Sequence, residues 1–107
     1  MMSEVRSVTF DDMVDALADI QRRKLMVALL EHNPQDDSPA VVEGPEIDTL
    51  ENLVSMKHVH LPKLADYGFI EWHQERQEVS KGPNFDEIRP LLELLDNHED
   101  ELPTDWL

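Results

Sequence analysis

Apolar residues recur at helical spacing in two stretches of the first third of the chain. Thr9 and Asp12 are typical of a helix N-cap, and the stripe that follows consists of Phe10, Met13, Val14 and Leu17. A second helix is predicted to begin at Asp19 and to end near Pro34, with an apolar face of Leu25, Met26, Ala28, Leu29 and Leu30. The two stripes predict two packed helices at the start of a domain.

The stretch from Leu50 to Trp72 changes its period partway along. Its first part predicts one helix that ends at Gly68, since a helix end favours a residue that tolerates a left-handed backbone. Beyond the glycine, Ile70 and Trp72 alternate with polar residues, which predicts a half-buried strand. A polar tip and a returning strand at 78–80 complete a hairpin. The shared helix face consists of Leu50, Leu53, Val54, Leu61, Leu64 and Ala65.

The remaining segments are a loop, a last helix and two chain ends. Residues 33–46 are rich in proline, aspartate and serine, so we expect a loop there, with a short edge strand at 40–43. Asn84 and Glu87 predict a cap for a helix that carries Ile88, Leu91, Leu92 and Leu95; Pro90 either kinks this helix or marks its first turn. We expect one domain over residues 9–96, a disordered N-terminus at 1–8 and an acidic tail at 97–107.

Composition narrows the class of protein. At 107 residues the chain has room for one hydrophobic core. It has neither an apolar run long enough for a membrane span nor a basic-then-apolar leader, so we expect a cytoplasmic protein. The sequence contains no cysteine, which excludes disulfides, thiolate metal sites and a cysteine nucleophile.

The formal charge of -15, from 24 acidic and 9 basic residues, allows two interpretations. Carboxylates on the surface adapt a protein to molar salt, where charge repulsion is screened within about 3 Å. Alternatively, the chain repels nucleic acid and binds basic partners. The acids are spread from Glu4 to Asp105, which favours the halophilic interpretation. The charge by itself does not exclude DNA.

Two phrases carry a resemblance to a known family. H-L-P-K-L-A-D-Y-G-F-I-E-W at 60–72 and A-L-A-D-I-Q-R-R-K-L-M-V-A-L-L-E at 16–31 resemble the ArsR-like regulators of halophilic archaea. The resemblance implies a winged helix-turn-helix that is mainly α with a small β-hairpin wing. It also implies a dimeric, DNA-binding transcriptional regulator. The chain departs from the family pattern before the central helix, where only Pro45 to Asn52 is left to supply a positioning helix and its turn.

The resemblance suggests which residues contact duplex DNA. If 50–65 is one regular helix with Leu61 inward, then Asn52, Ser55, Met56, Val59 and Lys63 point outward. Basic residues gather in the elements that a winged helix presents to phosphates, although they could equally be solvated or paired with the many carboxylates. The predicted DNA-contacting residues are Arg22, Arg23, Ser55, Lys57, His60, Lys63, Arg76 and Lys81.

Other functions receive less support. An outward face with Met56 and Val59 also suits a winged-helix module that binds a protein and no DNA, which is the alternative hypothesis. His58 and His60 are two residues apart and would lie on different faces of a helix, so we expect no metal, and no other cofactor either. No phosphate-binding loop, nucleophile elbow or metal-spaced histidine set is present, so we expect no catalytic residues and no enzyme activity.

The apolar stripes of the first and last helices exceed what one small core can cover. ArsR-like proteins dimerise through their terminal helices, so the resemblance implies a homodimer here as well. The predicted interface residues are Met13, Leu17, Leu91, Leu92 and Leu95.

Overall fold

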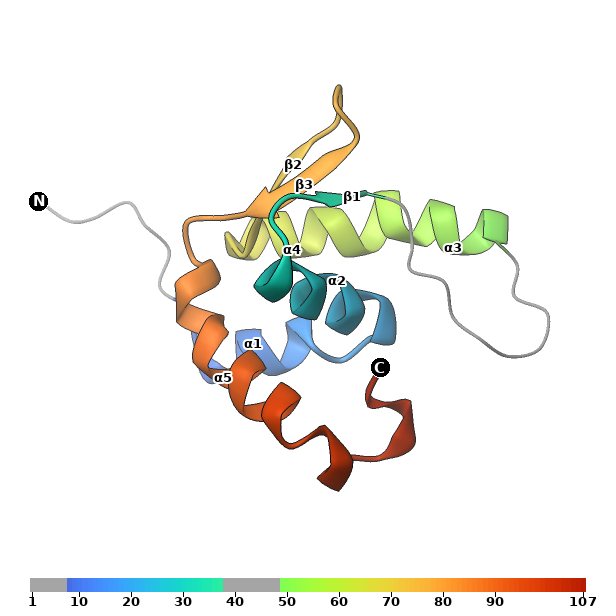
Figure 1. Cartoon of the computed structure of the whole chain (residues 1–107). Helices are drawn as coiled ribbons and strands as arrows, with labels where there is room; N and C mark the ends of the chain where they lie inside the picture. Colours follow the sequence, from blue (N-terminus) through green and yellow to red (C-terminus); the bar gives the residue numbers. More distant parts are fainter. Residues whose placement is uncertain (1–7, 38–48) are drawn as a thin grey trace, which may run out of the picture.

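The structure is a computed structural model that describes residues 8–37 and 49–107, and it is mainly helical with a small antiparallel sheet (Figure 1). The predicted fold class is confirmed at this level. The elements are α1 (Phe10–Ala16), α2 (Ile20–Glu31), β1 (Gln35–Asp36), α3 (Thr49–Ser55), the π-helical turn η1 (Met56–His60), α4 (Leu61–Tyr67), β2 (Ile70–His73), β3 (Glu78–Lys81), α5 (Phe85–Asn97), and the 3-10 turns η2 (Glu99–Glu101) and η3 (Thr104–Trp106).

The first two helices begin where their capping residues predict. The Thr9 hydroxyl accepts from the Asp12 amide at 3.1 Å, and the Asp12 carboxylate accepts from the Thr9 amide at 3.0 Å, which makes a reciprocal capping box. Asp19 caps α2 by accepting from the Gln21 amide at 2.8 Å. Both caps satisfy backbone donors that the first helical turn leaves without partners.

The central helix contains a π turn. Side chains before and after this turn therefore point in directions that one regular helix would not give them. Segments α3, η1 and α4 follow one another directly, and Gly68 ends the helix with a left-handed backbone at φ 82°, as predicted. The extra residue in a π turn rotates what precedes it by about 100°. The prediction that Met56 points outward is therefore wrong, since Met56 is 1% exposed, whereas Val54, predicted to be buried, is 48% exposed.

The hairpin is part of a three-stranded sheet with the order β1-β3-β2. Strands β2 and β3 pair with Trp72 opposite Val79, and β1 adds to the free edge of β3 with Gln35 opposite Val79. The sequence placed β1 inside a loop, and the predicted edge strand at 40–43 lies outside the described residues. In Figure 1 the base of the hairpin lies beside the central helix, and its tip projects away from the helices.

Helix α5 does not start with the predicted cap. The Asn84 side chain makes no capping hydrogen bond and instead donates to the Tyr67 carbonyl at 2.9 Å, at the end of α4. A Cβ at Gly68 would lie 2.6 Å from Asn84 Nδ2, so the glycine also makes room for this amide. Pro90 lies inside α5 rather than in its first turn.

Helix α2 packs against elements from several parts of the chain. It contacts η1 and β1 on one side and α5 and the C-terminal turn η3 on the other (Figure 1). The core includes residues from the helices and the sheet, among them Met26, Leu29, Met56, Phe69 and Phe85. Within the described part of the chain, no helix is both long enough and apolar enough to cross a membrane.

The structure describes little of the predicted N-terminal segment and all of the predicted C-terminal tail. Residues 1–7 lie outside the described part, and Val8 packs against the core. The segment predicted as an acidic tail, 97–107, carries η2 and η3 and returns to α2, where Trp106 and Leu107 pack against the core.

The π turn predicts opposite costs for two neighbouring apolar residues. Met56→Ala should lower the free energy of unfolding by about 2–5 kcal/mol, because it leaves a cavity in the core. Val59→Ala, at a residue that is 48% exposed, should change it by less than about 0.5 kcal/mol. Urea unfolding of both variants at one salt concentration measures the difference. Equal small effects would mean that the helix is regular and that Met56 faces solvent.

Candidate functional site

Arg22, predicted to contact DNA, is buried at the corner between α1 and α2. Only 6% of the residue is exposed. Its Nε donates to the Ala16 carbonyl at 2.9 Å, Nη2 to the Asp15 carbonyl at 3.0 Å, and Nη1 lies 2.8 Å from Nδ1 of His60. The guanidinium closes the end of α1 and joins it to the π turn, so the surface role predicted for Arg22 is wrong.

His60 is the partner of Arg22 and is buried with it. A guanidinium can only donate, so Nδ1 of His60 accepts and its Nε2 carries the proton, 3.5 Å from the Asp19 carboxylate. Burial lowers the pKa of His60, the Asp19 carboxylate opposes this shift, and the Arg22 guanidinium adds to it. Only 7% of the residue is exposed, so the DNA contact predicted for His60 is wrong.

Lys63 is half-buried and bound to α1. Its ammonium donates to the Asp15 carboxylate at 2.7 Å, and the Tyr67 hydroxyl donates to the same oxygen at 2.5 Å. The hydrogen bonds from Lys63 and Tyr67 hold the pKa of Asp15 below its ordinary value. The charge of Lys63 is therefore largely compensated within the molecule.

The remaining residues predicted to contact DNA differ in how far they are already engaged within the chain. Arg23 donates to the Leu17 carbonyl at 2.8 Å and to the carbonyls of Trp106 at 2.8 Å and Asp105 at 3.0 Å, so it holds the C-terminal turn on α2. Lys81 lies over the Phe85 ring, 5.3 Å from its centroid. Arg76, on the hairpin tip, has a side chain that is 62% exposed and pairs at 3.2 Å with Glu78. Ser55 is half-buried on α3.

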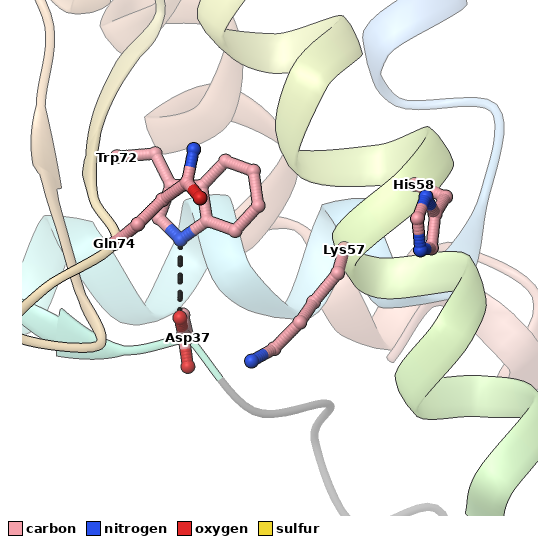
Figure 2. Close-up of a pocket in the computed structure, with 5 residues that line it drawn as sticks. All are labelled: Asp37, Lys57, His58, Trp72 and Gln74. Carbon is pink, nitrogen blue, oxygen red and sulfur yellow. Dashed lines mark hydrogen bonds between the residues drawn. The ribbon is translucent and has the colours of Figure 1, made fainter.

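A hollow of about 390 Å³ lies between the central helix and the hairpin (Figure 2). Lys57 extends from η1 toward the side where Asp37 and Trp72 lie. The Trp72 indole N–H donates to the Asp37 carboxylate at 3.0 Å, and Asp37 is 3% exposed. The lining residues are Asp37, Lys57, His58, Trp72 and Gln74.

The hollow contains one predicted site residue and several that sequence reasoning missed. Lys57 was predicted to contact DNA. Sequence reasoning assigned no functional role to Asp37 in the predicted loop, to Trp72 in the strand or to Gln74 in the hairpin tip. The alternation of polar and apolar residues in the strand placed Trp72 on one face of the sheet. No local pattern links it to Asp37, since their contact depends on β1 joining the sheet.

The predicted dimer residues divide into two groups. Leu17 and Leu92 are buried in the core of a single chain, so their assignment to a dimer interface is wrong. Met13, Leu91 and Leu95 are partly buried against the same core. The large apolar side chains that α1 and α5 leave exposed are Phe10, Val14 and Leu94.

Within residues 8–37 and 49–107, no group of three histidine or carboxylate side chains could hold a metal ion. Comparison of the chain with protein-family models, curated proteins and solved structures found no match.

Neutral His60 should make stability depend on pH below its ordinary pKa near 6.5. Because burial lowers the folded-state pKa, the unfolded chain takes up the proton first as the pH falls. The stability that depends on the neutral ring is complete above about 6.5 and is lost as the pH falls through the folded-state pKa. Asp15 contributes at lower pH, below its ordinary value of 3.8.

Urea unfolding of the wild type and His60→Gln between about pH 8 and pH 5 measures this dependence. The stability difference between the two proteins should be constant above about pH 6.5 and should shrink below it. The other histidines are common to both proteins and cancel in the difference. A difference that is independent of pH would contradict a buried neutral His60.

Proposed function

We propose that this protein is a winged-helix transcriptional regulator that binds duplex DNA as a homodimer. The observation that carries the proposal is the hollow between the central helix and the hairpin, with Lys57 extending into it from the helix (Figure 2). A helix and a projecting hairpin on one side of a small domain are the two elements that a winged helix presents to a duplex.

The order of the elements supports the winged-helix interpretation. Among residues 8–37 two helices precede the central helix, Gly68 ends it, and the hairpin β2-β3 follows directly. The positioning helix expected before a recognition helix would fall partly within 38–48, outside the described residues. The ArsR-like resemblance therefore rests on the two sequence phrases and on this order of elements.

The DNA contacts in this proposal are fewer than the sequence predicted. Arg22 and His60 are buried, and Arg23 holds the C-terminal turn. Lys57 has no hydrogen-bond or ion-pair partner among residues 8–37 and 49–107, and Arg76 has only a surface ion pair, which contributes little. Ser55 is half-buried, Lys63 pairs with Asp15, and Lys81 lies over the Phe85 ring. Such a set positions a protein on phosphates and reads few bases.

The acidic surface is compatible with this proposal only at high salt. At a charge of -15 the chain repels DNA in dilute buffer. Screening within about 3 Å at 1 M salt removes most of this repulsion and also most of the gain from counterion release. We therefore expect binding to rely on short-range contacts at the molar salt of a halophilic cell.

The homodimer remains part of the proposal with a revised contact. Phe10, Val14 and Leu94 are 64%, 50% and 56% exposed, and solvent does not favour such large apolar side chains. We place the dimer contact on these side chains of α1 and α5, together with the half-buried Met13, Leu91 and Leu95.

A second candidate function has one observation in its favour. Leu53, Val54 and Val59 are exposed on the central helix, where base readout would require hydrogen-bonding side chains. Such a face fits a winged-helix module that binds another protein and no DNA. Met56, which the sequence assigned to this face, no longer belongs to it.

Arg76→Gln should weaken DNA binding, because it removes a phosphate contact from the hairpin tip. We expect an affinity loss of about twofold to tenfold at multimolar salt. The measurement is fluorescence anisotropy of labelled genomic fragments in potassium chloride from low to multimolar concentration. Retained fragments should bind two chains each.

Arg89→Gln is the matched control, because Arg89 lies on α5 and its hydrogen bonds at 3.0 and 2.8 Å go to Asp86. It should bind DNA as the wild type does. Equal affinities for both variants would remove the hairpin from the interface. No binding by folded wild-type protein at any salt concentration would reject DNA binding and favour the protein-interaction module.

A further inference from the structure

Among the described residues, the buried carboxylate of Asp37 has little to offset its charge. It is 3% exposed, and its side chain accepts one neutral hydrogen bond, from the Trp72 indole, among the residues that the structure describes. A carboxylate removed from water normally has a cation or several donors close to it. The side of Asp37 that faces the hollow therefore favours a positively charged group.

Lys57 supplies the opposite charge to the same hollow without reaching Asp37. Both residues line the space, but no ion pair joins them within the described ranges. Figure 2 shows the ammonium directed toward the carboxylate. A ligand between the two charges would meet a cation at one end and an anion at the other.

The other lining residues and the volume indicate which uncharged part of a ligand the hollow fits. Trp72 offers an aromatic surface and Gln74 an amide that both donates and accepts. A hollow of about 390 Å³ has the volume of roughly a dozen water molecules and lies near the lower end of small-molecule sites. This space suits a molecule of about a dozen non-hydrogen atoms.

We propose that the hollow binds a free α-amino acid with an aromatic or aliphatic side chain. Its carboxylate pairs with Lys57, its ammonium with Asp37, and its side chain packs against Trp72. The π turn makes this possible, because it places Lys57 at the hollow while Met56 and His60 turn into the core. The site goes beyond DNA binding and makes the domain a receptor for a small zwitterion.

Isothermal titration calorimetry with three related probes tests the pairing of charges. L-phenylalanine carries both charged groups, phenethylamine only the ammonium, and 3-phenylpropanoate only the carboxylate. L-phenylalanine should bind saturably, and each of the other two at least about tenfold more weakly, since each loses one charged hydrogen bond. Equal binding of the three probes, or no saturable heat from L-phenylalanine, would overturn the proposal.

Two variants should change the preference in opposite directions. Asp37→Asn keeps an acceptor for the Trp72 indole but removes the negative charge, so 3-phenylpropanoate should bind at least as tightly as L-phenylalanine. Lys57→Gln should weaken L-phenylalanine by at least about tenfold and leave phenethylamine unchanged. An unchanged order of the three probes in both variants would refute the assignment.

Lys24→Gln is the matched control for the lysine variant. Lys24 lies on α2 and does not line the hollow, so L-phenylalanine should bind this variant as it binds the wild type. Far-UV circular dichroism of each variant reports whether it is folded. A loss of affinity in Lys24→Gln equal to that in Lys57→Gln would attribute the effect to net charge and overturn the proposal.

Discussion

The buried hydrogen bonds of Arg22 join the end of α1 to the π turn of the central helix. One guanidinium closes the C-terminal end of α1 through the Asp15 and Ala16 carbonyls and reaches His60 in the π turn of the central helix. Removing a charged group from water is costly unless its donors are satisfied, and the donors Nε, Nη1 and Nη2 each have a partner here. The interaction ties the π turn to the corner between α1 and α2.

The π turn decides which side chains of the central helix lie on the surface. With His60 directed inward, Met56 enters the core, Val59 stays in solvent, and Lys57 faces the hairpin across the hollow. Several cations that looked available in the sequence instead stabilise the fold: Arg22 at the corner, Arg23 on the C-terminal turn and Lys63 on Asp15. Lys57 has no ion pair among the described residues, and Arg76 has only a surface pair with Glu78.

Local chemistry made much of the fold predictable. Caps at Thr9 and Asp19, the stop at Gly68 and the hairpin follow from residue types and periods that act over a few positions. The π turn was not predictable, because an inserted residue leaves the composition of a helix unchanged and only tertiary contacts reveal it. Arg22 was misassigned because arginine is seldom buried. The burial of Asp37 was not predicted, because it follows β1, which is two residues long and depends on its pairing with β3.

The most direct test of this account is the tautomer of His60 in the folded protein. Long-range ¹H–¹⁵N correlation of the imidazole nitrogens at neutral pH distinguishes a protonated Nδ1 from a protonated Nε2. Because Arg22 can only donate to Nδ1, the account predicts a single neutral tautomer with the proton on Nε2. A proton on Nδ1, or the averaged signals of a freely exchanging ring, would show that Arg22 does not hold the π turn.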